Sequence, residues 1–136
     1  MKFDDFIKEG KARRASKDTQ LSESLVKTSE QDLTFLNKTE ITEESARKIM
    51  VGYYDTLRSL LEAAAILKGY KIYSHEAYTY FLKEQKEEVL AEKFDRLRRI
   101  RNDINYYGKN ISIEEVKEHK EEIINIIIEL RKKYLQ

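Results

Sequence analysis

The stretch from Ile49 to Gly69, IMVGYYDTLRSLLEAAAILKG, determines the fold of this chain. Its apolar residues recur at intervals of three and four, the spacing that places side chains on one face of an α-helix. The members of this stripe are Ile49, Tyr53, Leu57, Leu60, Leu61, Ala64 and Leu67. Thr42 is the predicted N-cap, Glu43 and Glu44 follow it, and Gly69 supplies a C-terminal stop. We therefore predict a long helix between Thr42 and Gly69.

The composition of all 136 residues favours helices throughout. The chain contains no proline, no cysteine and only four glycines, so it lacks the residues that sheets and tight turns usually require. At this length about two thirds of the surface of the unfolded chain is buried on folding, which is enough for one core without disulfides. We predict a single all-α domain over residues 1–136, an up-and-down bundle of four to six helices. The helices of residues 1–41 are the least clearly defined.

The helices on either side of the central one are predicted from apolar spacing and capping residues. Residues 3–15 predict a short helix that becomes basic toward its end, and residues 16–37 predict a longer one despite many serines and threonines. Ser74 is the predicted N-cap of the helix that follows Gly69. The polar residues 83–88 predict a break after it.

Two more helices are predicted in the C-terminal part. One carries an apolar stripe from Leu90 to Ile104 and stops at Gly108, and the last one opens with Ser112 and Glu115 in capping-box spacing. The last helix is apolar over more than one face, which indicates either deep burial or a subunit interface. The residues predicted for the core of the bundle are Tyr53, Leu57, Leu60, Ala64, Leu67, Phe81, Phe94, Leu97, Ile104, Ile123, Ile127 and Leu130.

An unusual set of polar side chains gathers in the stretch LRRIRNDINYYG, Leu97 to Gly108. At about 100° per residue, one side of this helix carries Arg98, Arg101, Asn102 and Asn105. The apolar stripe beside them consists of Leu97, Ile100, Ile104 and Tyr107. Burying such polar groups unpaired would cost about 1 to 3 kcal/mol each. These residues are therefore either the polar rim of a solvated helix, or they bind another helix, a second subunit or a phosphate group.

Charge is balanced over the whole chain and concentrated locally. The chain has 26 Lys and Arg against 25 Asp and Glu, a net charge of +1, so the attraction of the entire molecule to nucleic acid is weak. Between residues 91 and 110, six basic residues stand against three acidic ones. The sequence shows no basic and apolar leader and no apolar run long enough to span a membrane, so we expect a cytoplasmic protein.

The two histidines do not indicate a metal or nucleophilic site. A di-iron site in a helical bundle needs Glu-x-x-His pairs, and the positions three before His75 and His119 hold Ile72 and Val116. Ser74 adjoins His75 in sequence, which does not create the geometry of a catalytic triad. We interpret His75 as a first-turn residue after the Ser74 cap and His119 as a surface or interface histidine. We expect neither a metal nor a cofactor.

Several features of this chain occur together in one known family. Between Val51 and Leu82 they are the pair Tyr53 and Tyr54, the run from Glu62 to Leu67, Gly69 with Tyr70, and Ser74, His75 and Glu76 at a helix start. A further feature is Arg101 followed by Asn102. In this order and spacing they resemble a HEPN domain, a small helical fold related to the helical domain of kanamycin nucleotidyltransferase. The resemblance covers most of the chain from Thr42 onward.

The resemblance implies a homodimer with a composite cleft that binds or cleaves RNA. It also implies membership of a toxin and antitoxin pair, in which the partner protein is a small nucleotidyltransferase. Where the family has a histidine about five positions after the arginine, this chain has Tyr106. A tyrosine, with a pKa of about 10, is a poor base at neutral pH. The candidate catalytic residues are then Arg101, Asn102 and Tyr106, and the candidate phosphate-binding residues are Arg98, Arg101 and Asn105.

Three functional hypotheses follow. The first is a HEPN-like homodimer that binds RNA or a nucleotide and cleaves weakly or not at all. The second is an active metal-independent ribonuclease in which Tyr106 or Asp103 takes the place of the histidine. The third is a helical interaction module, in which the row around Arg101 pairs with carboxylates across a subunit seam. They differ in what the substitution Arg101→Ala should remove, which is binding, cleavage or stability.

Overall fold

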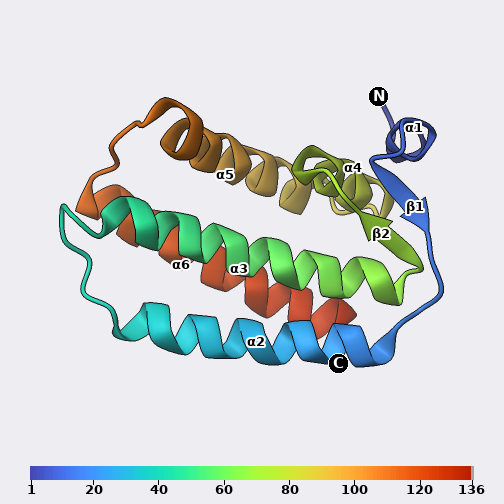
Figure 1. Ribbon diagram of the computed structural model, residues 1–136, viewed down its shortest axis with the longest axis horizontal. Helices are drawn as coiled ribbons and strands as arrows, with labels where there is room; N and C mark the ends of the chain where they lie inside the picture. Colours follow the sequence, from blue (N-terminus) through green and yellow to red (C-terminus); the bar gives the residue numbers. More distant parts are fainter. Residues whose placement is uncertain (136) are drawn as a thin grey trace.

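A computed structural model describes residues 1–135 of the chain and shows an all-α bundle with one small sheet (Figure 1). The N-terminal half contains α1 (Phe3–Lys8), β1 (Ala12–Arg14), α2 (Thr19–Lys38) and α3 (Ala46–Leu67). The C-terminal half contains β2 (Tyr70–Ile72), α4 (His75–Glu84), α5 (Glu88–Tyr107) and α6 (Ile113–Tyr134). The predicted all-α class is confirmed, and the helices of the described residues number six.

α3 is the central helix of the bundle. It packs against α2 and α6, which lie beside it in Figure 1, and it also contacts α4, α5 and β2. Residues Ala63 to Ile66 are all buried, so α3 has almost no solvent face near its C-terminal end. The wide apolar face of the sequence between Ile49 and Gly69 is explained by this central position.

The predicted core is confirmed at all positions except Leu67. Leu67 is only half-buried because it is the last residue of α3 and lines a surface hollow together with Leu135 and residues of α2. The isoleucine-rich face of α6 is buried inside this chain, since Ile123 and Ile127 belong to the same core and α6 packs on α3. Deep burial therefore accounts for most of that face, and only Ile128 is strongly exposed on it.

The predicted helix over residues 3–15 is wrong in its second half. α1 ends at Lys8, Gly10 turns the chain at a φ of +77°, and β1 then pairs antiparallel with β2. In this pairing Ala12 lies opposite Ile72, and Arg14 lies opposite Tyr70. Three paired residues per strand carry no readable periodicity, so the sequence does not reveal this sheet. The sheet fastens the N-terminal segment beside the start of α4.

The regular part of the central helix begins later than predicted, but Thr42 makes the hydrogen bonds of an N-cap. α3 begins at Ala46, and Ser45 precedes it without a capping bond from its side chain. The Thr42 backbone N–H donates to Ser45 Oγ at 2.8 Å, and Thr42 Oγ1 accepts from the Ser45 N–H at 3.1 Å. The Thr42 carbonyl accepts from the Ala46 N–H at 2.8 Å, so Thr42 caps the turn of residues 43–45 that leads into α3.

Most of the other predicted boundaries are confirmed. α4 and α5 are separated by residues 85–87, and Gly108 ends α5 in a left-handed conformation at a φ of +63°. Ser112 and Glu115 form the predicted capping box of α6. Ser74 holds the N-cap position of α4, but its side chain makes no capping hydrogen bond.

Candidate functional site

Three arginines gather around a tyrosine and a histidine where α3, α4 and α5 meet. Tyr54 and Arg58 lie one turn apart on α3, Arg98 and Arg101 lie three residues apart on α5, and His75 is the first residue of α4. Charges on all three arginines act on both Tyr54 and His75. We call these five residues the arginine cluster.

A stacked pair, Tyr54 and His75, forms the centre of the cluster. The rings are 5.8 Å apart at an interplanar angle of 19°, and the Tyr54 hydroxyl lies 2.9 Å from His75 Nδ1. Phe94 of α5 stacks on Tyr54 as well, at 5.6 Å. Tyr54 is completely buried, which raises the pKa of its hydroxyl against the opposing effect of Arg101. The hydroxyl is therefore protonated at neutral pH, and its hydrogen bond with His75 Nδ1 holds the imidazole ring whichever of the two groups donates.

Two aromatic rings lie close to Arg101. Its guanidinium carbon lies 5.7 Å from the ring centre of Tyr54 and 5.8 Å from that of Tyr106, a geometry that favours cation–π attraction. Nη1 donates to Asn102 Oδ1 at 3.3 Å. Within residues 1–135 the buried Nε of Arg101 has no hydrogen-bond partner, and the side chain forms no ion pair. The half-buried side chain thus keeps a charge that an anion can pair with.

Arg98 and Arg58 differ in how well a carboxylate neutralises their charge. Arg98 donates through Nε and Nη2 to the same oxygen of Asp95, at 3.0 and 2.9 Å. Burial raises the pKa of Asp95, but the bonds from Arg98 and Thr79 hold it below its ordinary value. Arg58 forms an ion pair of 3.5 Å with Glu62 and lies against the buried Tyr78 hydroxyl, while its buried Nε lacks a partner in the described part of the chain. Arg101, which forms no ion pair among these residues, is accordingly the least satisfied of the three arginines.

An acidic neighbour, Asp55, limits the positive potential of the cluster. Burial raises the pKa of this carboxyl group, while Arg101 and Arg58 lower it. No ion pair joins Asp55 to either arginine in the contacts of the described residues. The carboxyl group therefore reduces the local charge without occupying the donors of Arg101.

The predicted row on α5 comes together only in part. Asn102 contacts Arg101, but Arg98 is occupied by Asp95, and Asn105 points into solvent. Tyr106 is 70% exposed and lies beside Arg101 at the edge of the cluster. These placements leave the predicted roles of Arg101, Asn102 and Tyr106 open and give Asn105 no contact with the cluster.

Including Tyr107 in the apolar stripe is wrong. Its side chain is 79% exposed, whereas Ile104, one turn earlier, is buried. The Ile104 carbonyl also accepts a hydrogen bond from Arg47 Nη2 of α3, at 3.4 Å. The last turn of α5 therefore runs beyond the packed part of the bundle, so its apolar residues have nothing to pack against.

Sequence reasoning missed the role of His75. The residue does lie in the first turn of α4, as predicted, but its ring is half-buried inside the cluster. Burial and the charges of Arg58, Arg101 and Arg98 lower its pKa to about 4, so the ring is neutral at pH 7. Its contact with Tyr54 spans 21 positions. Only the joint occurrence of both residues among the family-like features pointed to a connection.

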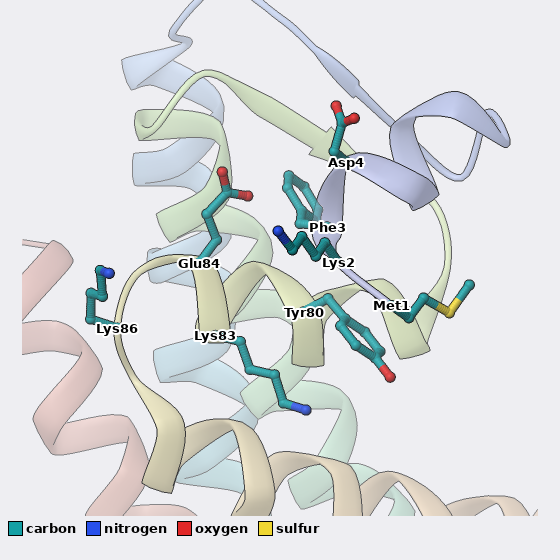
Figure 2. A pocket seen from close by; sticks show the side chains of 8 residues that line it. All are labelled: Met1, Lys2, Phe3, Asp4, Tyr80, Lys83, Glu84 and Lys86. Atoms are coloured by element: carbon teal, nitrogen blue, oxygen red, sulfur yellow. The ribbon is translucent and has the colours of Figure 1, made fainter.

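Two surface hollows carry mixed charge. One, of about 380 Å³, lies between the N-terminal segment and α4 (Figure 2). It is lined by Met1, Lys2, Phe3, Asp4, Tyr80, Lys83, Glu84 and Lys86. The other, of about 420 Å³, lies between α4 and α5, and there Arg99 forms an ion pair with Asp95. The arginine cluster, with two incompletely satisfied guanidinium groups, is the better candidate for an anion.

Comparisons of this chain with protein-family models, curated proteins and solved structures return no match. The residues that the structure describes include no group of three or more His, Asp or Glu side chains placed to hold a metal ion. Across the same residues, every helix is too short or too polar to cross a membrane. The arginine cluster is therefore the feature of the molecule that indicates a function.

Proposed function

We propose that this chain is a HEPN-like protein that binds RNA or a nucleotide through a phosphate group at the arginine cluster. The observation that carries the proposal is the state of Arg101. Its guanidinium lies between two aromatic rings, has a buried Nε without a partner among residues 1–135, and forms no ion pair there. A half-buried cation of this kind gains most from a ligand that supplies both negative charge and acceptor oxygens.

The surroundings of Arg101 suit a phosphate group. Arg58 supplies a second cation, and Asn102 holds one edge of the Arg101 guanidinium through its side-chain oxygen. Partial burial strengthens each charge-assisted hydrogen bond, because water screens it less. Tyr106 stands exposed at the edge of the cluster and offers a hydroxyl donor or a ring on which a base can stack.

The test is the affinity of a short fluorescent single-stranded RNA for Arg101→Ala and Asn102→Ala variants, measured by anisotropy. Arg101→Ala should weaken binding by about 10- to 100-fold, the value of one or two charged hydrogen bonds, while the melting temperature changes little. Arg99→Ala is the matched control, since Arg99 lies on the same helix with a 73% exposed side chain. An equal loss in Arg99→Ala would show that the binding is general attraction to positive charge.

A ribonuclease is the second candidate function, and the position of His75 favours it. The family-like motif of this chain lacks its histidine, but α4 brings an imidazole to the same cluster by another route. Imidazole is the side chain best suited to exchange protons near neutral pH. Cleavage that depends on both Arg101 and His75 would establish this function.

The remaining parts of the proposal are a homodimer and a nucleotidyltransferase partner within a toxin and antitoxin pair. The resemblance implies both, and the isoleucine face of α6 gives no support for a dimer because it is used inside the chain. The interaction module is the competing outcome of the same experiment. Its signature would be an Arg101→Ala variant that unfolds at lower temperature or dissociates from its partner subunit.

A further inference from the structure

We propose that His75 is a binding residue for the phosphate group at the arginine cluster, and that binding of the anion protonates it. This inference rests on the proposed function, because it concerns the same site. Protonated His75 would then bind the ligand together with the arginine side chains. The ligand expected at the arginine cluster is a phosphate, or a similar anion such as sulfate, with accessible oxygens.

The hydrogen bond to Tyr54 leaves one nitrogen of His75 available. Nδ1 is bonded to the Tyr54 hydroxyl, and which of the two donates depends on the tautomer of the ring. Among the hydrogen bonds of residues 1–135 none involves Nε2, and the ring is only half-buried. Stacking on Tyr54 and the hydrogen bond to its hydroxyl fix the ring orientation. Nε2 is therefore the nitrogen of His75 that a ligand can bond.

The charges that face His75 are mainly positive. α3 supplies Tyr54 and Arg58, and α5 supplies Arg98 and Arg101. Three carboxyl groups act on these arginines: Asp95 bonds Arg98, Glu62 pairs with Arg58, and Asp55 on α3 lies within the influence of Arg58 and Arg101. Burial and the three guanidinium charges keep His75 neutral, with a pKa of about 4. The empty cluster thus disfavours a fourth positive charge at this position.

A bound anion reverses this balance. It offsets the charges of Arg58 and Arg101, so that the ring takes up a proton from solvent. In the charged ring, Nδ1–H donates to the Tyr54 oxygen and Nε2–H donates to the anion. An opposite charge within about 4 to 6 Å favours the charged form of a side chain by about 1 to 3 in pKa. The pKa of His75 should then rise from about 4 to between about 5 and 7 in the complex. By linkage, the anion binds more tightly as the pH falls through that range.

The test is an NMR titration of the histidine ring protons with sulfate as the probe, at matched ionic strength with chloride as reference. Sulfate keeps the same charge over the pH range of the titration, about pH 4.5 to 8, so every change observed comes from titration of the protein. The chain has two histidines, and His119 on α6 is the internal control. We expect saturating sulfate to raise the pKa of His75 by about 1 or more and to move that of His119 much less.

Variants make the result specific. The affinity of wild-type protein for sulfate should increase about tenfold between pH 7.5 and 5, and this increase should disappear in His75→Gln and persist in His119→Gln. Arg101→Lys keeps the charge but loses the fork geometry, so it should weaken binding while the pH dependence remains. A dinucleoside monophosphate replaces sulfate in a second titration. If the dinucleotide raises the pKa of His75 as much as sulfate does, the site binds internal RNA phosphates. If only sulfate raises it, the site binds terminal phosphate groups.

Two failures are distinguishable. If sulfate and the dinucleotide bind the wild type no better than Arg101→Ala at every pH, the phosphate site itself is absent and both proposals are overturned. If the anion binds in an Arg101-dependent way and the pKa of His75 stays at its value in chloride, the site stands and the role of His75 is overturned.

Discussion

His75 takes up a proton more readily in the unfolded chain than in the folded one. Its folded pKa is about 4 against an ordinary value of 6.5, so the unfolded state binds more protons between these pH values. Stability should therefore fall as the pH decreases from about 6.5 to 4. Because the ring is half-exposed, solvent screening reduces the loss to about 1 to 2 kcal/mol. Urea unfolding at pH 7.5 and 4.5 measures it.

The control for this prediction is His75→Gln, which cannot titrate in the window. Carboxyl groups such as Asp95, whose pKa is lowered in the folded state, also lose stabilising interactions in acid, so the two proteins must be compared at each pH. The wild type should lose more stability than His75→Gln. Equal losses would mean that His75 is as easily protonated in the folded chain as in the unfolded one.

The sequence predicts only those residues of the arginine cluster that lie on one helix. Arg101 and Asn102 were found because they are adjacent and share a helix face. Tyr54, Arg58 and His75 belong to two other helices, and the angle at which those helices cross α5 brings them together. Helical spacing describes neighbours within one element, so it contains no information on such a crossing.

The serines at the starts of α4 and α6 should contribute differently to the stability of the protein. Ser112 Oγ accepts from the Glu115 N–H at 3.1 Å, so Ser112→Ala should destabilise the protein by about 1 kcal/mol. Ser74 has the same position in α4 without a capping bond, so Ser74→Ala should cost distinctly less. Thermal or urea unfolding of the two variants makes the comparison. A larger loss in Ser74→Ala would contradict the assignment of the caps.

The elements differ in how well the sequence predicted them, for a physical reason. The long helices were predicted because each buries one stripe for several turns, and a repeated signal can be recognised. β1 and β2 were missed because each consists of three residues, and their pairing depends on where α1 and α3 end. Thr42 makes the bonds of a cap, but residues 43–45 form a turn before the regular helix, and the sequence pattern does not distinguish such a turn from the first turn of a helix.

At the scale of the whole molecule, we predict a two-fold dimer formed around α5. Tyr106 and Tyr107 are strongly exposed at the end of this helix, next to the arginine cluster. Exposed aromatic side chains are typical anchors of interfaces. Light scattering at micromolar concentration should give twice the mass of the chain. Tyr107→Ala should weaken the dimer more than Phe35→Ala, the matched change at an exposed aromatic residue of α2. A monomeric wild type would exclude the composite cleft.

The last prediction concerns cleavage of RNA, and the chemistry of the proton-transfer group decides it. In the absence of a bound anion His75 is neutral with a pKa of about 4, and Tyr106 is a poor base, so the free site holds no group matched to neutral pH. General acid–base catalysis contributes about a hundredfold to ten-thousandfold, and most of it should be missing. We expect feeble cleavage by the wild type at pH 7.5.

The assay compares the wild type with Arg101→Ala, His75→Gln and Tyr106→His on the same RNA. Tyr106→His restores an imidazole at the family-like motif, so a gain of activity in this variant would indicate a nuclease that has lost its base. Strong cleavage by the wild type that disappears in Arg101→Ala would contradict the prediction. If that cleavage also disappears in His75→Gln and increases toward pH 6, where the negative charge of the substrate phosphate has raised the pKa of the ring enough for it to take up a proton, then the histidine of α4 performs the proton transfer that Tyr106 cannot.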